Sequence, residues 1–190
     1  VNLGDFMPLA FKKPAIKGIL TGIARIKDPF GKPVLDFEGN ADSLVVDDEL
    51  VGNTKLQGSA NFITGKVNYE AITSDSTNDF SIKGTYNYKD SVKGLLDVSI
   101  AGEKVSLALI EPYLKTVFSD MEGVATSNLR ITGTGRKKSV IGTTTIKEGS
   151  VKVAYTQCRY LIRNQTVNFE DGVINLGYFQ LRDTLSNTAT

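Results

Sequence analysis

Apolar and polar residues alternate along most of the chain, a pattern that predicts β-strands with one buried side. The alternation is clearest in residues 79–90 (DFSIKGTYNYKD) and 92–100 (VKGLLDVSI). Beside Val92, the apolar residues that share one side of these two stretches are Phe80, Ile82, Tyr86, Tyr88, Leu96, Val98 and Ile100. Both stretches therefore predict strands with a polar side in water and an apolar side that faces either a core or a groove.

Clusters of Gly, Pro, Asp, Asn and Ser separate the alternating stretches and predict tight turns. These clusters are DPFGKP at 28–33, STNDF at 76–80, YKDS at 88–91 and FEDG at 169–172. Between them, in residues 55–71, the apolar phase changes near Phe62, which indicates a bulge, a bend or a corner. The chain is expected to be mainly β, with many strands that follow one another as a meander.

Two stretches depart from this alternation and predict short helices. One lies over residues 107–120, and a weaker signal lies around residues 6–11. From the first stretch to the residue just after it, apolar residues recur at the four-residue spacing of a helix surface, at Leu109, Tyr113, Val117 and Met121. This helix is expected to plug or cap the sheet rather than to touch a ligand, because uncovered apolar ends of a sheet promote aggregation.

Both helical segments contain proline and precede similar strand sequences, GILTGIARI at 18–26 and GVATSNLRI at 123–131. This internal repeat divides the chain into two units. The first unit is residues 1–104, with an N-terminal helical segment, and the second is residues 105–190, with the helix at 107–120 followed by strands. The chain opens without Met and closes on what looks like an unfinished strand, so both units are expected to belong to one continuous piece of a longer protein.

Composition removes several classes of function. The formal net charge is +1, and Lys and Arg are scattered among Asp and Glu without forming a basic stripe, so nucleic acid is not expected as a partner. The absence of His removes the commonest general base and most zinc sites. No apolar run is long enough for a membrane helix. We expect neither an enzyme nor a bound cofactor or metal.

Individual motifs agree with this expectation. Three acids at 47–49 are consecutive on a predicted turn and do not converge as an acid/base pair must, so a solvated turn is favoured over weak calcium binding. The stretch GTGRKKS at 133–139 lacks the second Gly of a phosphate loop and predicts an exposed basic hairpin turn. Cys158 is expected to be a small apolar strand residue.

The order of motifs in residues 105–190 resembles the C-terminal region of the TamB (translocation and assembly module) family of diderm bacteria, in its Bacteroidota form. TamB belongs to the wider AsmA-like group. The residues that carry the resemblance are Leu109, Ile110, Pro112, Tyr113 and Leu114 in the helix, then Gly123, Leu129, Ile131 and Gly133, then Gly142, Ile146, Glu148 and Gly149. Ser127 and Thr144 depart from the family pattern, residues 1–30 form a degenerate copy, and residues 31–104 match only in texture.

The resemblance implies an elongated β-sheet that is curled into a taco-like trough with an apolar lining. It implies a non-enzymatic protein of the periplasm, whose parent is anchored in the inner membrane and reaches the outer membrane. The implied partners are phospholipid acyl chains, carried along the trough, and an outer-membrane protein of the BamA superfamily. On this interpretation, the seven apolar residues of 79–100 named above line the groove.

Other interpretations stay open. The same one-sided strands suit the core of a closed β-sandwich. A scaffold for the assembly of outer-membrane β-barrel proteins would use exposed strand edges to pair with incoming strands. A surface β-solenoid or adhesin is a weaker alternative, because the sequence shows no aromatic or acidic binding patch.

Four short motifs, each an Asp followed by Ser or Thr, resemble the O-glycosylation acceptor that Bacteroidota use on periplasmic proteins. The candidate acceptors are Ser43, Ser76, Ser91 and Thr184. Ordinary turn residues are the alternative interpretation of all four.

Overall fold

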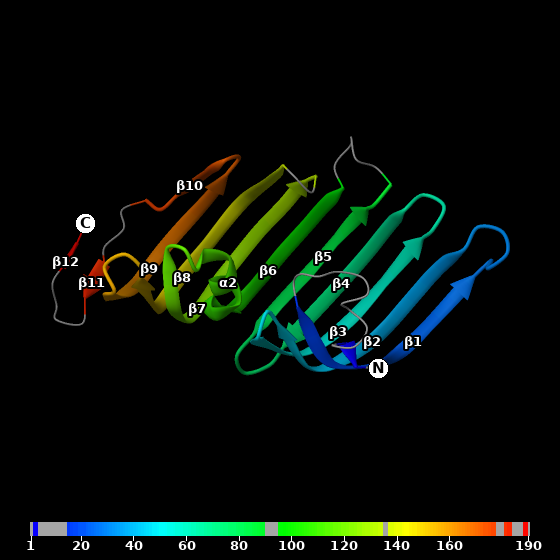
Figure 1. Ribbon diagram of the computed structural model, residues 1–190, viewed down its shortest axis with the longest axis horizontal. Helices are drawn as coiled ribbons and strands as arrows, with labels where there is room; N and C mark the ends of the chain where they lie inside the picture. Colours follow the sequence, from blue (N-terminus) through cyan, green and yellow to red (C-terminus); the bar gives the residue numbers. More distant parts are fainter. Residues whose placement is uncertain are drawn as a thin grey trace.

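The protein is one open antiparallel sheet in which nearly every strand pairs with the next along the chain (Figure 1). A computed structural model describes residues 2–3, 15–89, 95–134, 137–177, 181–183 and 188–189. The strands are β1 (Ile16–Lys27), β2 (Val34–Val46), β3 (Glu49–Asn61), β4 (Lys66–Ser74), β5 (Asp79–Asn87), β6 (Leu96–Ser106), β7 (Phe118–Gly133), β8 (Lys138–Val153), β9 (Arg159–Glu170), β10 (Val173–Asn175), β11 (Leu181–Asp183) and β12 (Thr188–Ala189). Strands β10 and β11 both pair with β9, and β12 pairs with β11. The expected class, mainly β with an elongated sheet and one or two short helices, is confirmed.

The helix predicted over residues 107–120 is shorter than expected. A 3-10 helix, η1 (Leu107–Ile110), continues into a single α-helical turn, α2 (Glu111–Leu114), and β7 already begins at Phe118. Alternation resumes at that point, and extended pairing of β7 with β8 takes the place of further helical turns. The weaker helical signal at residues 6–11 lies outside the described residues.

The predicted boundary between two units at residue 104 falls inside β6, which is hydrogen-bonded along most of its length to β5 on one side and β7 on the other. The sheet therefore continues across that position. The two repeat copies lie in β1 and β7, where their leading glycines, Gly18 and Gly123, both have positive φ, 145° and 111°. Each glycine lies within four residues of a register shift in its strand, so the repeat marks two similar irregular strand beginnings.

The turns that the sequence predicts are present. Asp47 and Asp48 form the two-residue link between β2 and β3 and both have positive φ, 49° and 73°, as in the tight hairpin turns that match strand twist. The phase change near Phe62 is also a hairpin turn, not a bulge or a corner within one strand. There the Asn61 side-chain carbonyl accepts hydrogen bonds from the backbone of Ile63 (3.0 Å) and Thr64 (2.9 Å), which reverses the chain.

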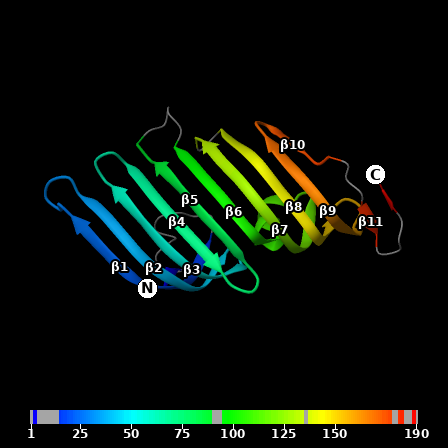
Figure 2. The same ribbon diagram turned by 180° about the vertical axis from the view of Figure 1, so that it is seen from behind.

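Register divides the sheet into an apolar and a polar face. Directly paired residues share a face, and the row Ile82, Ile100, Leu129 is apolar while the neighbouring row Lys83, Ser99, Arg130 is polar. The helical segment lies over the face seen in Figure 1, and Figure 2 shows the opposite face.

The two ends of the sheet also differ. The turns that follow β1, β3, β5 and β7 lie at one end of the sheet, called here the hairpin end, and η1 and α2 lie at the other, the cap end.

Buried side chains concentrate toward the cap end in two clusters. One contains Leu107, Met121, Ala125, Ile146, Val151 and Ile162, with Leu114 and Phe118 packed against it. The other contains Leu3, Ala41, Leu44, Val51 and Phe80, with Leu109 packed against it. Register shifts in β1, β2, β6 and β7 fall in the same half of the sheet. Bulges strengthen the local twist and bend a strand, so this half is the more irregular part of the sheet.

Candidate functional site: an apolar sheet face

The helical segments η1 and α2 are called here the cap. Three parallel rows of apolar side chains cross the sheet on the face that carries the cap, between the cap end and the hairpin end. These three rows are called here the apolar face. From the hairpin end inward, the large members of the rows are Ile26, Leu35, Val67, Tyr86 and Leu96; then Phe37, Tyr69, Val98, Ile131 and Val140; then Leu56, Ile82, Ile100, Leu129 and Phe169. From β1 to β7 the other positions of the three rows are Ala or Gly, so the rows contain no charged residue there, and the outermost row ends in β8 at Lys138.

Glycines in these rows make room for large neighbours. The Phe37 ring lies against Gly58, where an added Cβ would approach Cζ of the ring to 2.6 Å. Gly84 similarly adjoins Val98, whose Cγ2 would lie 3.1 Å from an added Cβ. The middle row therefore reads, from β2 to β6, Phe37, Gly58, Tyr69, Gly84, Val98, with large and small residues in turn. This alternation lets bulky side chains lie along the sheet instead of standing away from it.

Tyr69, in the middle row, is partly removed from water. Burial raises the pKa of the Tyr69 phenol, because the ionised form loses hydration there. Tyr86, nearer the hairpin end, is 40% exposed. The middle row is therefore more buried at Tyr69 than the outermost row is at Tyr86.

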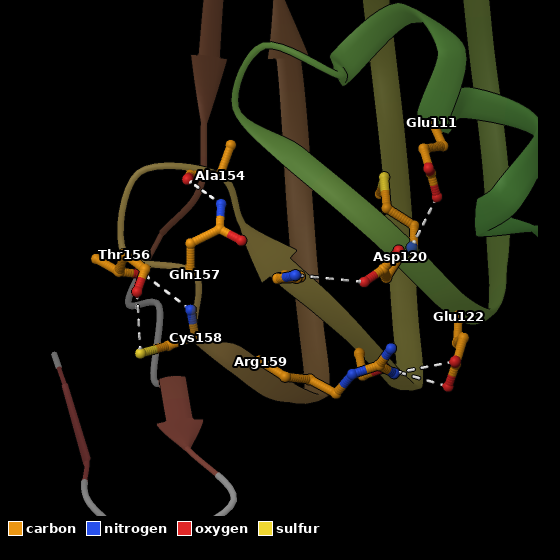
Figure 3. Close-up of polar contacts among 11 residues, drawn as sticks. Glu111, Asp120, Glu122, Ala154, Thr156, Gln157, Cys158 and Arg159 are labelled. Carbon is orange, nitrogen blue, oxygen red and sulfur yellow. Dashed lines mark hydrogen bonds and ion pairs between the residues drawn. The ribbon is translucent and has the colours of Figure 1, made fainter.

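The cap closes the apolar face at one end. Leu107 of η1 is 2% exposed and lies in the same cluster as Met121. The Glu111 carboxylate at the start of α2 accepts a hydrogen bond of 2.8 Å from the backbone N–H of Met121, which fixes the helical turn to β7 (Figure 3). Among the described elements, η1 and α2 contact β3, β6 and β7 in particular, so the rows nearer the hairpin end extend beyond the cap.

Polar contacts brace the strands beneath the cap. Arg159 of β9 forms an ion pair of 3.0 Å with Glu122 of β7 and donates to the Ser150 hydroxyl of β8 at 2.8 Å (Figure 3). Lys152 and Asp120 form a looser pair of 3.9 Å. These side chains are partly exposed and already paired with one another, which indicates a structural brace of small energetic weight and not a catalytic group.

The structure brings five of the seven predicted groove residues together on the apolar face. Tyr86 pairs with Leu96 and Ile82 with Ile100, while Val98 lies opposite Gly84. Two predictions need correction. Phe80 shares this parity but is packed in the buried cluster with Leu3 and Leu44, at 8% exposure. Tyr88 lies in the turn beyond β5 and is 46% exposed.

Sequence reasoning missed most members of the apolar face, among them Phe37, Tyr69 and Leu129. Each lies in an alternating stretch, so the signal was present in the sequence. What the pattern lacked was the pairing register, which shows that these residues lie in line with Ile82 and Val98.

The opposite face is polar and contains a shallow hollow of about 520 Å³ over β1–β5, lined by residues that include Arg25, Glu38, Gln57, Glu70 and Lys83. Cross-strand pairs satisfy several of these groups. Gln57 donates to Glu70 at 2.6 Å, and Arg25 lies 3.4 Å from Glu38. Farther along this face the Arg130 guanidinium donates two hydrogen bonds to Asp97 and holds the pKa of that carboxyl below its ordinary value. Charges paired in this way form a hydrated surface, not a converging acid/base site.

The other sequence predictions have mixed outcomes. Cys158 is not a strand residue: it is exposed in the turn before β9, where its thiol donates to the Thr156 carbonyl at 3.4 Å (Figure 3). Ser43 is exposed at an irregular position of β2 with φ 51°, and Ser76 is exposed in the β4–β5 turn. Ser91 and Thr184 lie outside the described residues.

Two absences hold for the residues that the structure describes. No group of three or more metal-ligating side chains comes together there. No helix in that part of the chain has the length and apolar character needed to cross a membrane.

The fold and the face define a class of protein: a long, open, meandering sheet that is apolar on one side and polar on the other. Comparisons of the chain with protein-family models, curated proteins and solved structures found no match.

Proposed function

We propose that this chain is a periplasmic segment of a TamB/AsmA-like protein, and that its apolar face binds phospholipid acyl chains in transit between the inner and outer membranes. The observation that carries the proposal is the continuity of apolar rows without a charged residue, the two inner rows across β1–β8 and the outermost row across β1–β7. Large apolar surfaces are rare on soluble proteins and usually mark a binding site.

The dimensions of the face suit an acyl chain. Eight strands spaced about 4.8 Å apart extend over about 34 Å, and three rows at every second residue form a band about 14 Å wide. A hydrocarbon chain needs a continuous dry surface and no directed polar contact, so a row of alternating side chains is sufficient. The function is therefore one of binding and conduction without catalysis. The parent protein would be anchored in the inner membrane and would meet a BamA-superfamily partner at the outer membrane.

The test compares two substitutions at neighbouring positions of β5 that face opposite sides. Tyr86→Asp puts a charge in the outermost apolar row, whereas Thr85→Asp puts the same charge on the polar face. The protein is expressed in a bacterial periplasm, and bound lipid is measured by native mass spectrometry and by lipid extraction. We expect phospholipid on wild type and on Thr85→Asp, and strongly reduced phospholipid on Tyr86→Asp while circular dichroism remains unchanged. Wild type without lipid, or equal lipid on both variants, would contradict the proposal.

A second candidate function, assembly of outer-membrane β-barrel proteins, is favoured by the edge of the sheet. Among the described strands β1 has one neighbour, β2, and on its other side the described pairing is a single bridge from Asn2 to Ile19. A strand with an open edge can accept an incoming strand by backbone hydrogen bonding. Hydrogen exchange decides between the two functions: an added β-hairpin peptide from an outer-membrane barrel should slow exchange of the β1 amides if strands pair there, whereas lipid should leave them unchanged.

A further inference from the structure

The hairpin end of the sheet presents a row of large apolar side chains to solvent. The turn after β1 exposes Phe30 (102%), the turn after β3 exposes Phe62 (44%) and Ile63 (53%), and the turn after β5 exposes Tyr88 (46%). These turns line up along one edge of the sheet (Figure 1). Turns need Gly, Asn, Asp or Pro for backbone reasons, but nothing in turn geometry calls for an exposed Phe or Ile. The row, called here the hairpin rim, therefore suggests a contact surface.

Hydrogen bonds between neighbouring turns hold the rim together. The backbone N–H of Phe62 donates to the Pro33 carbonyl at 3.2 Å, which links the first turn to the second. The Tyr88 N–H donates to the Gly65 carbonyl at 3.1 Å. The Lys89 ammonium donates to the carbonyls of Phe62 (2.8 Å) and Ile63 (2.9 Å), which links the second turn to the third. The apolar side chains are thus presented from connected turns, so little ordering is needed when they meet a surface.

Exposed lysines accompany the apolar side chains of the rim. Exposed Lys32 adjoins Phe30 in the first turn, and exposed Lys137 and Lys138 lie at the fourth turn, between β7 and β8. The acid in the first turn, Asp28, points its carboxylate back at the backbone N–H of Lys32, 2.6 Å away. At the cap end the turn between β2 and β3 is instead made of two acids, Asp47 and Asp48, followed by Glu49. Over β1–β8 the two ends of the sheet therefore differ in charge as well as in exposed apolar surface, whereas the turn between β9 and β10, also at the hairpin end, carries the exposed acids Glu170 and Asp171.

We propose that the hairpin rim docks on the surface of a bilayer that contains anionic phospholipid. Aromatic and aliphatic side chains on separate turn tips enter the interfacial region singly, where amphipathic rings are most stable, and lysines beside them attract the negative leaflet. A protein partner would need a continuous packed patch, and here the apolar groups are spread over separate turns. The outermost apolar row, with Leu35 and Tyr86, adjoins the rim, so docking would bring the apolar face next to a source of lipid. The inference stands whether or not that face carries lipid.

The test uses the absence of tryptophan from the chain. Phe30→Trp places a single indole on the rim, and Tyr155→Trp places one at an equally exposed aromatic position, 96% exposed, in the turn between β8 and β9 at the cap end. Vesicles contain equal parts of phosphatidylcholine and phosphatidylglycerol, or phosphatidylcholine alone. With anionic vesicles we expect the emission of Phe30→Trp to shift to shorter wavelength and to be quenched by brominated acyl chains, and the emission of Tyr155→Trp to stay unchanged. No shift for Phe30→Trp, or equal shifts for both, would overturn the proposal.

Charge is tested in the same Phe30→Trp background. Lys137→Glu with Lys138→Glu should weaken vesicle binding by about 25-fold or more, since each lysine near an anionic surface contributes about fivefold in affinity. Lys104→Glu, an exposed lysine of β6 toward the cap end, is the control and should have little effect. Binding should also fall steeply with salt. Equal binding to neutral vesicles, or an undiminished affinity of the double variant, would overturn an anionic partner. Vesicle binding reports on the rim and extracted lipid on the apolar face, so the two proposals fail separately.

Discussion

The ring of Phe37 in β2 lies over Gly58 in β3 so closely that a methyl group on Gly58 would come within 2.6 Å of the ring. The two residues are directly paired across the strands. An aromatic ring that covers a paired glycine packs along the sheet and shields its backbone, and it fixes how far the apolar face rises above the strands.

Gly58→Ala should destabilise the sheet by about 1–3 kcal/mol, the usual cost of overpacking. The added methyl group meets both the Phe37 ring and the backbone carbonyl of Asn68, and neither can move without disturbing a strand. Urea unfolding followed by circular dichroism measures the loss. Ser59→Ala, the next residue on the polar face, is the control and should change stability by less than about 0.5 kcal/mol. An unchanged midpoint for Gly58→Ala would show that the ring is not held against the glycine.

Thr54 and Thr73 form a buried pair whose hydroxyl oxygens are 2.8 Å apart, and they are 3% and 0% exposed. Thr73→Val removes one partner and leaves the Thr54 hydroxyl with a long contact of 3.4 Å to the Gly52 carbonyl. We expect this substitution to cost about 1–3 kcal/mol, as an unsatisfied buried polar group does. The double variant Thr54→Val with Thr73→Val should cost less than the sum of the single variants. Additive costs in this double-mutant cycle would mean that the two hydroxyls do not interact.

Lowering the pH should reduce the unfolding free energy of the protein through protonation of Asp75 in the β4–β5 turn. Backbone N–H groups of Asn78 (2.9 Å) and Thr77 (2.8 Å) donate to its carboxylate and hold its pKa below the ordinary value. A carboxyl whose pKa is lower in the folded state contributes stability above the unfolded pKa of about 4, and this contribution disappears as the pH falls through the folded pKa.

The advantage of wild type over Asp75→Asn in unfolding free energy should therefore be full near neutral pH and shrink below about pH 4. Urea unfolding at a series of pH values measures it. Ser76→Ala, in the same turn, should follow the wild-type pH profile in parallel. A difference between wild type and Asp75→Asn that stays constant down to the acid limit would contradict the assignment.

Glycosylation at Ser43 or Ser76 remains a prediction that the exposure of both residues permits. Expression in the periplasm of a Bacteroidota host should yield an intact mass above that of the bare polypeptide. The excess should decrease in Ser76→Ala or in Ser43→Ala, whichever carries the sugar. A mass equal to the polypeptide would identify both serines as ordinary turn and strand residues.

The sequence indicated the strands and turns well, because their signals are local. Alternation identified β5 and β6, and paired acids at Asp47 and Asp48 marked a turn. The helix at 107–120 was overestimated, because Val117 and Met121 suit helical spacing and strand alternation equally well. Extended pairing of β7 with β8 from Phe118 onward decided between them.

By itself the sequence determined that the chain forms many one-sided strands in a meander. Successive side chains of a strand point to opposite faces, so the alternation of apolar and polar residues is visible in each short stretch of sequence. Only the tertiary structure decided which apolar residues stand together. Phe80 and Ile82 have the same parity in β5, yet Phe80 is a buried member of the cluster with Leu44, whereas Ile82 is only partly buried against that cluster and belongs to an apolar row. The difference depends on pairing register and on the position of the cap, which arise from contacts between residues distant in the chain. The hairpin rim was also outside the reach of local patterns, since it exists only where separate turns meet along one edge of the folded sheet.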